Sequence, residues 1–256
     1  MLPSELINII SEYSEEYNLL DWIPIEKLNW KTLSSNENAV YLLEKNLDKI
    51  NWIFLSGNKN AVHLLEKYPE KINWNVLSEN ENAIHLLEKY AIDDDPEKIN
   101  WMFLSGNKNA IHLLEKYPEK IDWDWLSSNE NAIHLLEKYP ENISWHALSR
   151  NKNAISLLEN NIDKIDWDNL SENENAIHLL EKYPENINWT YLSSNKNAIS
   201  LLEKNIDKVN WQLFSTNENG INLLEQSDID DYHLSKNKNI FKSNKQDLIK
   251  LLLTIL

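Results

Sequence analysis

The sequence predicts an all-α protein, an α-solenoid of about nine 22-residue helix-turn-helix repeats with capping helices at both ends. A tryptophan recurs every 22 residues along most of the chain, with one spacing of 27 residues. A fixed period of this length is typical of stacked repeats, because one such unit cannot bury its apolar side alone. Only 3 glycines are present, too few for many tight β-turns. The repeat tryptophans are Trp30, Trp52, Trp74, Trp101, Trp123, Trp145, Trp167, Trp189 and Trp211.

The repeat divides the chain into three parts. We expect an N-terminal helical cap at residues 1–27, the repeat array at residues 28–240 and a C-terminal capping helix at residues 241–256. The array carries a five-residue insertion at residues 91–95, which is expected to be a surface loop. The last helix is rich in leucine and isoleucine, so it either covers the final repeat or serves self-association.

The first half of each repeat predicts a short helix, helix A. In the copy at Trp123, Asp122 precedes the tryptophan and is a strong N-cap residue. Trp123 and Leu126 are three residues apart, so they lie on one face of the helix. Stacking of the repeats should therefore place the tryptophans in a ladder inside the core.

The second half predicts a second helix, helix B. Its apolar residues follow helical spacing, as in Ile133 and Leu136, and Pro140 prevents the helix from continuing. An asparagine such as Asn129 precedes each of these stripes, and we expect it to be the N-cap of helix B. The equivalent asparagines are Asn36, Asn58, Asn80, Asn107, Asn151, Asn173, Asn195 and Asn217.

The residue that follows this asparagine alternates in charge from one repeat to the next. Neighbouring repeats should therefore place opposite charges opposite one another, which would favour the correct register. Duplication of an ancestral two-repeat unit explains the same alternation equally well. The alternating residues are Glu37, Lys59, Glu81, Lys108, Glu130, Lys152, Glu174, Lys196 and Glu218.

Charge and composition exclude several classes of function. The net charge is −16 and no lysine-rich run appears, so we expect no nucleic-acid binding, and an acidic surface suits a basic protein partner. The chain has no cysteine, no apolar run long enough to span a membrane and no secretory signal at its start. We therefore expect a soluble intracellular protein that does not bind membranes.

The candidates for chemistry all follow the repeat. Five histidines share one position of helix B, where other repeats have tyrosine, serine or asparagine, which indicates an exposed and permissive position. Residues one repeat apart are too distant to converge on one metal ion. No glycine-rich phosphate loop or isolated catalytic triad occurs, so we expect no enzyme activity, no cofactor and no metal site. These histidines are His63, His85, His112, His134 and His178.

Residues that vary between repeats are the best candidates for partner binding. The two residues after each tryptophan vary most, and the residue after the conserved serine also varies. Aromatic residues and arginine are favoured anchors at protein interfaces. The alternative is that the second residue after each tryptophan packs between neighbouring helices A. The candidate protein-binding residues are Phe54, Met102, Phe103, Trp125, His146, Arg150 and Tyr191.

Two stretches resemble known families. The unit Trp-x-x-Leu-Ser-x-Asn-x-Asn-Ala-Ile-x-Leu-Leu-Glu-Lys resembles short tandem repeats of mimivirus-like large DNA viruses, over roughly residues 28–240. Those repeats often have proline between the two asparagines, where this chain has glutamate or lysine. The resemblance implies a viral protein that acts in the host cytoplasm or in the virion. Separately, residues 2–10 resemble the opening of an F-box, although the room before the first repeat suits only half of one.

These observations lead to one functional hypothesis and three alternatives. We expect a non-enzymatic scaffold or adaptor that binds viral or host proteins along its surface. A structural virion component that assembles through its ends is the first alternative. The others are an F-box-like adaptor of a ubiquitin ligase and an acidic mimic of nucleic acid. The identity of the partner does not follow from the sequence.

Overall fold

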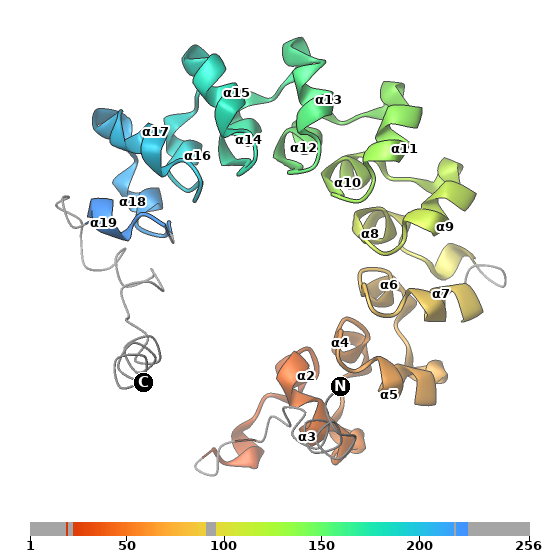
Figure 1. Ribbon diagram of the computed structural model, residues 1–256. Coiled ribbons are helices and arrows are strands. Elements are labelled where there is room, and N and C mark those ends of the chain that lie inside the picture. Colours follow the sequence, from red (N-terminus) through yellow and green to blue (C-terminus); the bar gives the residue numbers. More distant parts are fainter. Residues whose placement is uncertain (1–18, 20–22, 91–95, 218, 225–256) are drawn as a thin grey trace, which may run out of the picture. The chain divides into compact units, whose positions relative to one another are not determined.

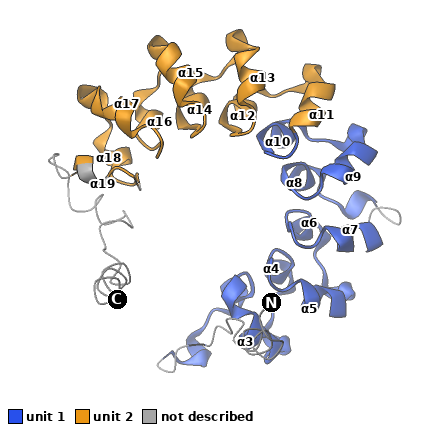
Figure 2. Cartoon of the chain, in the orientation of Figure 1, with its two compact units in different colours: residues 1–132 blue, residues 133–256 orange. Residues whose placement is uncertain are grey.

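The computed structural model describes residues 19, 23–90, 96–217 and 219–224. These residues form short α-helices and 3-10 helices, and no strand occurs among them. The helices recur with the 22-residue period, and the fold is the predicted α-solenoid. The chain divides into two compact units, residues 1–132 and residues 133–256, which Figure 2 shows in blue and orange.

Each unit is a stack of repeats in which helix A and helix B alternate (Figure 1). In unit 1, helices A are α2 (Trp30–Ser34), α4 (Trp52–Ser56), α6 (Trp74–Leu77), α8 (Trp101–Gly106) and α10 (Trp123–Ser128), and helices B are α3 (Val40–Glu44), α5 (Val62–Lys67), α7 (Ile84–Tyr90) and α9 (Ile111–Lys116). In unit 2, helices A are α12 (Trp145–Arg150), α14 (Trp167–Glu172), α16 (Trp189–Leu192) and α18 (Trp211–Phe214), and helices B are α11 (Ile133–Lys138), α13 (Ile155–Glu159), α15 (Ile177–Lys182), α17 (Ile199–Glu203) and α19 (Ile221–Leu224).

Short 3-10 helices complete the repeats. Most of them connect helix B to the next helix A, whereas η1 precedes the first repeat and η2 lies between α2 and α3. Most consecutive helices A contact one another within each unit, as α8 contacts α10 and α14 contacts α16. The 3-10 helices are η1 (Ile25–Lys27), η2 (Glu37–Ala39), η3 (Leu47–Lys49), η4 (Pro69–Lys71), η5 (Pro96–Lys98), η6 (Pro118–Lys120), η7 (Pro140–Asn142), η8 (Ile162–Lys164), η9 (Pro184–Asn186) and η10 (Ile206–Lys208).

Several predicted features lie outside the described residues. They are most of the N-terminal cap with its F-box-like stretch, the insertion at residues 91–95, the end of the array at residues 225–240 and the C-terminal helix at residues 241–256. The capping and self-association hypotheses for these segments therefore stay predictions.

The N-caps of helix A are confirmed. In α10 the side chain of Asp122 accepts a hydrogen bond from the backbone N–H of Trp125, at 3.1 Å. The same bond occurs in the other described helices A except α12, whose N-cap Ser144 makes no side-chain cap bond. Helix A is consequently short and begins at the tryptophan, as the sequence predicts.

The predicted N-cap of helix B is wrong. Helix α9 begins at Ile111, and its N-cap position is held by Ala110, which has no side-chain oxygen to cap it. Asn107 lies three residues earlier, where its Oδ1 accepts a hydrogen bond from the backbone N–H of Asn109 at 3.0 Å. The asparagine therefore stabilises the turn that precedes helix B, and its amide nitrogen is free to act elsewhere.

That amide nitrogen ties each repeat to the preceding one. In unit 1, the buried Asn80 donates through Nδ2 to the carbonyl oxygens of Ser56 and Asn58, at 3.0 and 3.2 Å. In unit 2, Asn195 makes the same pair of bonds to Ser171 and Asn173, at 3.0 and 3.1 Å. The bridge satisfies the carbonyl at the C-terminal end of the short helix A, such as that of Ser56, and adds a second bond to the carbonyl of Asn58, which already accepts the backbone N–H of Ala61.

Two further hydrogen bonds accompany this bridge. The second asparagine of the repeat donates to the next carbonyl of the preceding repeat, as Asn82 donates to Lys59 at 3.0 Å. The conserved serine, such as Ser56, donates through Oγ to the carbonyl of Trp52 and accepts the backbone N–H of Asn73. The fixed polar residues of the motif thus connect neighbouring repeats.

The core consists of leucine, isoleucine and alanine, and the tryptophans do not lie within it. Leu126 and Leu136 are fully buried within their units, and the isoleucine before each N-cap, such as Ile165, is 8% exposed. The predicted buried tryptophan ladder is wrong, because every described repeat tryptophan is only half-buried. Each tryptophan is the first residue of its helix A, and its indole packs on the segment that follows helix B.

The segment after helix B supplies a partner for the tryptophan in two ways. Where Tyr-Pro ends the helix, the tyrosine packs edge-on against the indole, as Tyr68 packs on Trp52 at 5.4 Å between centroids. Where asparagine replaces Tyr-Pro, a lysine lies over the indole, as Lys208 lies 4.5 Å from the ring centroid of Trp189. Proline ends the helix in the first class, as predicted.

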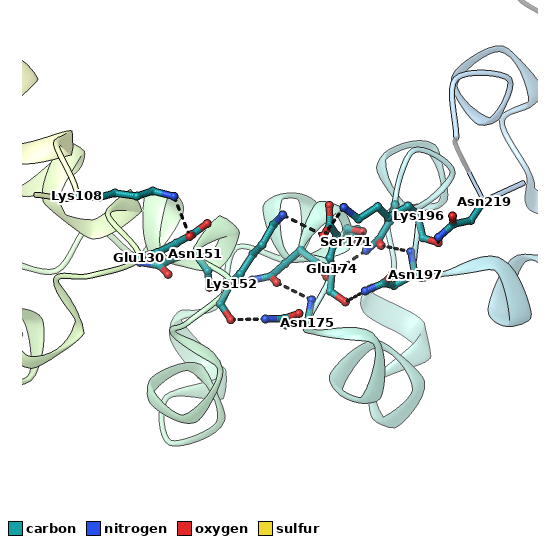
Figure 3. A network of polar contacts seen from close by, with 12 residues as sticks. Lys108, Glu130, Asn151, Lys152, Ser171, Glu174, Asn175, Lys196, Asn197 and Asn219 are labelled. Atoms are coloured by element: carbon teal, nitrogen blue, oxygen red, sulfur yellow. Dashed lines mark hydrogen bonds and ion pairs between the residues drawn. The ribbon is translucent and has the colours of Figure 1, made fainter. Parts of the chain in front are cut away.

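The charge alternation produces the expected ion pairs. In unit 1, Lys59 pairs with Glu81 at 3.1 Å, and Lys108 pairs with Glu130 at 2.9 Å. In unit 2, Glu174 lies between two lysines of the neighbouring repeats (Figure 3). These side chains are partly exposed, so each pair contributes only about 0–1 kcal/mol.

The asparagine bridge is testable by substitution. Asn80→Ala removes both bonds and leaves the carbonyl of Ser56 without its partner, so we expect it to lower the free energy of unfolding by about 1–3 kcal/mol. Asn82→Ala is the matched control, because Asn82 is exposed and water can replace its amide, so its cost should be smaller. Urea unfolding followed by circular dichroism measures both. Equal effects of the two substitutions would contradict a special role for the buried asparagine.

Candidate functional site

The exposed side of helices A is the most variable surface of the repeat. In α10, Leu126 and Ser127 point into the core, whereas Asp124 and Ser128 are exposed and Trp125 is 40% exposed. We therefore define the helix-A face as the side chains at the first, second and fifth positions after each repeat tryptophan. Of the six exposed large apolar side chains in the described residues, four lie on this face: Ile53, Met102, Trp125 and Tyr191.

Side chains on the helix-A face touch their neighbours in the next repeat. In unit 1, Nδ2 of Asn100 donates to Oδ1 of Asn75 at 3.0 Å. In unit 2, Nδ2 of Asn188 donates to Oδ1 of Asp168 at 2.7 Å. The first position of one repeat thus lies beside the N-cap residue of the next, so adjacent repeats present a continuous surface within each unit.

Unit 1 presents apolar side chains on this face. Phe103 and Trp125 pack edge to face, with ring centroids 5.7 Å apart. Trp125 also covers Gly106, where a Cβ atom would lie 2.8 Å from Cε3 of the indole. Met102 is 37% exposed and Ile53 is 52% exposed, which makes Ile53 the most exposed large apolar side chain of the described residues. We call these residues of α4, α8 and α10 the apolar stripe of unit 1, although the exposed Asn75 and Glu79 of the α6 repeat interrupt it.

Unit 2 presents mainly polar and charged side chains at the same positions. Nδ1 of His146 lies 2.8 Å from Oδ2 of Asp166, and Nδ2 of Asn169 donates to the backbone carbonyl of His146 at 2.8 Å. Arg150 pairs with Glu172 at 3.0 Å. The two units therefore offer chemically different surfaces on one scaffold.

The seven predicted binding residues lie on the helix-A face, in more than one group. Met102, Phe103 and Trp125 form one cluster in unit 1, and His146 and Arg150 lie together on α12 in unit 2. Phe54 lies on α4, where its ring packs under Nζ of Lys31 at 5.0 Å, and Tyr191 lies on α16. The structure does not place the two units relative to each other, so these groups are separate candidate sites.

The alternative, packing between helices A, holds for part of the second position. Asn169 is 3% exposed, and Phe54 and Phe103 are half-buried against the neighbouring repeat. Trp125 and Tyr191 remain 40% and 37% exposed. The side chain at the second position is therefore buried between helices A in some repeats and exposed in others, depending on which residue occupies the position.

Some members of the face were not among the predicted site residues. They are Ile53 and Asp124 at the first position, Val76 at the second and Glu79 at the fifth. The variability of these positions was a sufficient signal for them. Ile53, the most exposed large apolar side chain of the described residues, was left out because it is neither aromatic nor an arginine.

The histidines of helix B are exposed, as predicted, but each has a defined neighbour. In unit 1, Nε2 of His85 lies 2.8 Å from Oε1 of Glu66, and His63 and His112 make the same contact with Glu44 and Glu88. The contact recurs in unit 2 between His178 and Glu159 at 2.9 Å. Within the described residues, no group of three or more potential ligands is arranged to hold a metal ion.

Two carboxyl groups in unit 2 have lowered pKa values. Burial alone would raise the pKa of Asp166, but hydrogen bonds from the backbone of Asn169 and from His146 outweigh this and lower it from 3.8. Burial would likewise raise the pKa of Glu174, but hydrogen bonds and charge interactions with Lys152 and Lys196 lower it from 4.5. Both groups remain ionised in mild acid, so the polar surface of unit 2 keeps its charge.

The lowered pKa of Glu174 predicts a dependence of stability on pH. A depressed pKa in the folded state stabilises the fold above pH 4.5, and this contribution is lost as the pH falls through the folded-state value. We expect Glu174→Gln to lower the melting temperature at pH 7, with the difference from wild type shrinking in acid. Glu181→Gln, at an exposed position of α15, is the control. A difference that is constant with pH would contradict the interpretation.

The contact between Gly106 and Trp125 predicts a coupling between the two positions. Gly106→Ala should displace the indole in the wild-type background. In a Trp125→Ala background the same change should stabilise by about 0.4–1 kcal/mol, because Gly106 has no positive φ and alanine restricts the unfolded chain. Thermal unfolding of the single and double variants measures the coupling, expected to be about 1 kcal/mol. Additive effects would show that the indole does not rest on Gly106.

Comparison with known proteins adds no family to this description. No family model, no curated protein and no solved structure matches the chain. Among the described residues, no helix is both long enough and apolar enough to cross a bilayer.

Proposed function

We propose that this chain is a non-enzymatic protein-interaction scaffold that binds its partners through the helix-A face. One observation carries the proposal: the leucine, serine and first asparagine that recur in the repeats are buried from the second repeat onward, and most side chains at the three variable positions of helix A are exposed on one face. Buried Asn80 and fully buried Leu126 belong to the first class, whereas Ile53 and Trp125 belong to the second. In repeat proteins, this separation lets the binding specificity change while the packing between repeats stays the same.

The chemistry of the exposed residues supports a protein as the ligand. Ile53, Met102 and Trp125 are large apolar side chains that remain 52%, 37% and 40% exposed. Contiguous apolar surface on a soluble protein commonly marks an interaction site. A tryptophan held at its edge by Phe103 suits an interface anchor, since its orientation is already restrained before binding.

The setting follows from the resemblance to the repeats of mimivirus-like viruses. We propose a viral protein that acts as an adaptor on host or viral proteins, in the host cytoplasm or in the virion. The apolar stripe of unit 1 and the polar surface of unit 2 would then contact different parts of one partner, or two partners. Partner capture tests this role directly.

The proposal predicts the outcome of affinity capture from cells that express tagged protein. The variant Ile53→Asn/Met102→Asn/Trp125→Asn places on the face an amide residue that Asn75 and Asn169 already supply in other repeats. We expect this variant to lose specific partners, identified by mass spectrometry, because the apolar anchors are gone. Its circular dichroism spectrum should stay that of the wild type.

The control changes a different exposed row. His85→Ser/His112→Ser alters helix B with a residue that Ser156 and Ser200 supply at the same position. This control should capture the wild-type set of partners. Identical partners for all three proteins, or loss of partners only in the helix-B variant, would overturn the role of the helix-A face.

A further inference from the structure

Two exposed carboxylates accompany the apolar cluster of α8 and α10, one on the preceding repeat and one on α10 itself. Met102, Phe103 and Trp125 form the cluster, which we call the α8–α10 cluster. Glu79 lies two residues after the end of α6, the preceding helix A, and Asp124 precedes Trp125 on α10. Both carboxylates belong to the helix-A face, at its fifth and first positions, and both side chains are exposed.

These two carboxylates differ from their equivalents in unit 2. There the fifth-position Glu172 pairs with Arg150 at 3.0 Å, and the first-position Asp168 accepts a hydrogen bond from Asn188. Within the described part of unit 1, neither Glu79 nor Asp124 has an ion-pair or hydrogen-bond partner through its carboxylate. The repeats of the α8–α10 cluster and the repeat before it therefore present two negative charges on the helix-A face that the chain itself does not neutralise.

We propose that the α8–α10 cluster binds a segment of a partner protein in which an apolar anchor is flanked on both sides by lysine or arginine. The anchor would pack on Met102 and Trp125, and the flanking cations would pair with Glu79 and Asp124. Trp125 is 40% exposed, and an aromatic ring of this kind also attracts a cation. This inference rests on the proposed function, and it adds the chemistry of the ligand.

Charge complementarity favours this occupant over others. The chain carries a net charge of −16, so it attracts basic segments and repels acidic ones, including nucleic acid. A second copy of the same face would bring Glu79 and Asp124 against like charges. Lys31, the cation on the face of unit 1 at α2, is held over the ring of Phe54 and lies on a different repeat from the cluster.

The geometry sets the spacing of the two cations. Packed helices lie about 8–10 Å apart, so the two helix steps from α6 to α10 span about 16–20 Å. An extended segment rises about 3.3 Å per residue and crosses this distance in about five or six residues. A helical segment rises 1.5 Å per residue and needs about 11–13 residues. The spacing of lysines in a peptide ligand can therefore report the bound conformation.

Fluorescence anisotropy with synthetic peptides and the full chain tests the inference. The probes are labelled peptides with a Leu-Trp-Leu anchor and a lysine on each side, at the extended or the helical spacing. In the controls glutamate replaces both lysines, or serine replaces the anchor. We expect one of the two lysine spacings to bind about tenfold more tightly than its glutamate counterpart, with affinity falling as salt is raised.

Substitutions in the chain then show which residues bind the peptides. Glu79→Ser/Asp124→Asn, whose new residues occur at the same positions of other repeats, should weaken the lysine peptide about tenfold and abolish its preference over the glutamate peptide. Trp125→Asn should weaken both peptides. Tyr191→Asn, on the helix-A face of unit 2, should change neither.

The outcomes separate this inference from the proposed function. Equal binding of lysine and glutamate peptides, or no binding of the lysine peptides at millimolar concentration, overturns the basic-apolar-basic ligand. An unchanged preference in Glu79→Ser/Asp124→Asn also overturns it, even if the helix-A variant still loses its captured partners. Captured partners that do not depend on the helix-A face overturn the proposed function, whatever the peptides do.

Discussion

The fold depends on one interaction, the buried asparagine amide that joins each repeat to the carbonyl groups of the preceding one. A helix of four to six residues leaves most of its backbone groups without an internal partner. Asn80 bonds the carbonyls of Ser56 and Asn58, and Asn195 does the same to Ser171 and Asn173. Within the described residues every buried side-chain nitrogen and oxygen has a hydrogen-bond partner. Helices this short persist only because their ends are satisfied by neighbouring repeats.

This constraint separates the residues that hold the array from those that face outward. The asparagine, the serine such as Ser56 and the leucine such as Leu126 are buried, and each contacts a neighbouring repeat or the core. The first position after the tryptophan takes no part in the asparagine bridge, so it accepts isoleucine, methionine or aspartate, as at Ile53, Met102 and Asp124. One backbone arrangement thus supports an apolar face in unit 1 and a polar face in unit 2.

The sequence allowed the architecture to be predicted, because the period and the N-caps of helix A are local signals. It did not reveal the role of the asparagine before helix B, since the partners of Asn80 are 22 and 24 residues away in the chain. A periodic pattern shows that equivalent residues stack, but it does not show which carbonyls are left unpaired. The half-burial of the tryptophans was missed for a related reason, because the neighbours of an indole, such as Tyr68 beside Trp52, lie in a distant part of the repeat.

For the candidate site too, the local sequence predicts where the surface lies but not the contacts between repeats that shape it. Variability between repeats located the helix-A face, yet the contacts that shape it depend on residues from two repeats. Trp125 rests on Gly106 and Phe103 of the preceding repeat, so its neighbours decide how it is presented. Charge behaves likewise, because Glu174 is neutralised by two lysines whereas Glu79 and Asp124 have no cation from the described repeats beside them. Some carboxylates of this acidic chain therefore form ion pairs between repeats. Those on the helix-A face of unit 1 stay available to a partner.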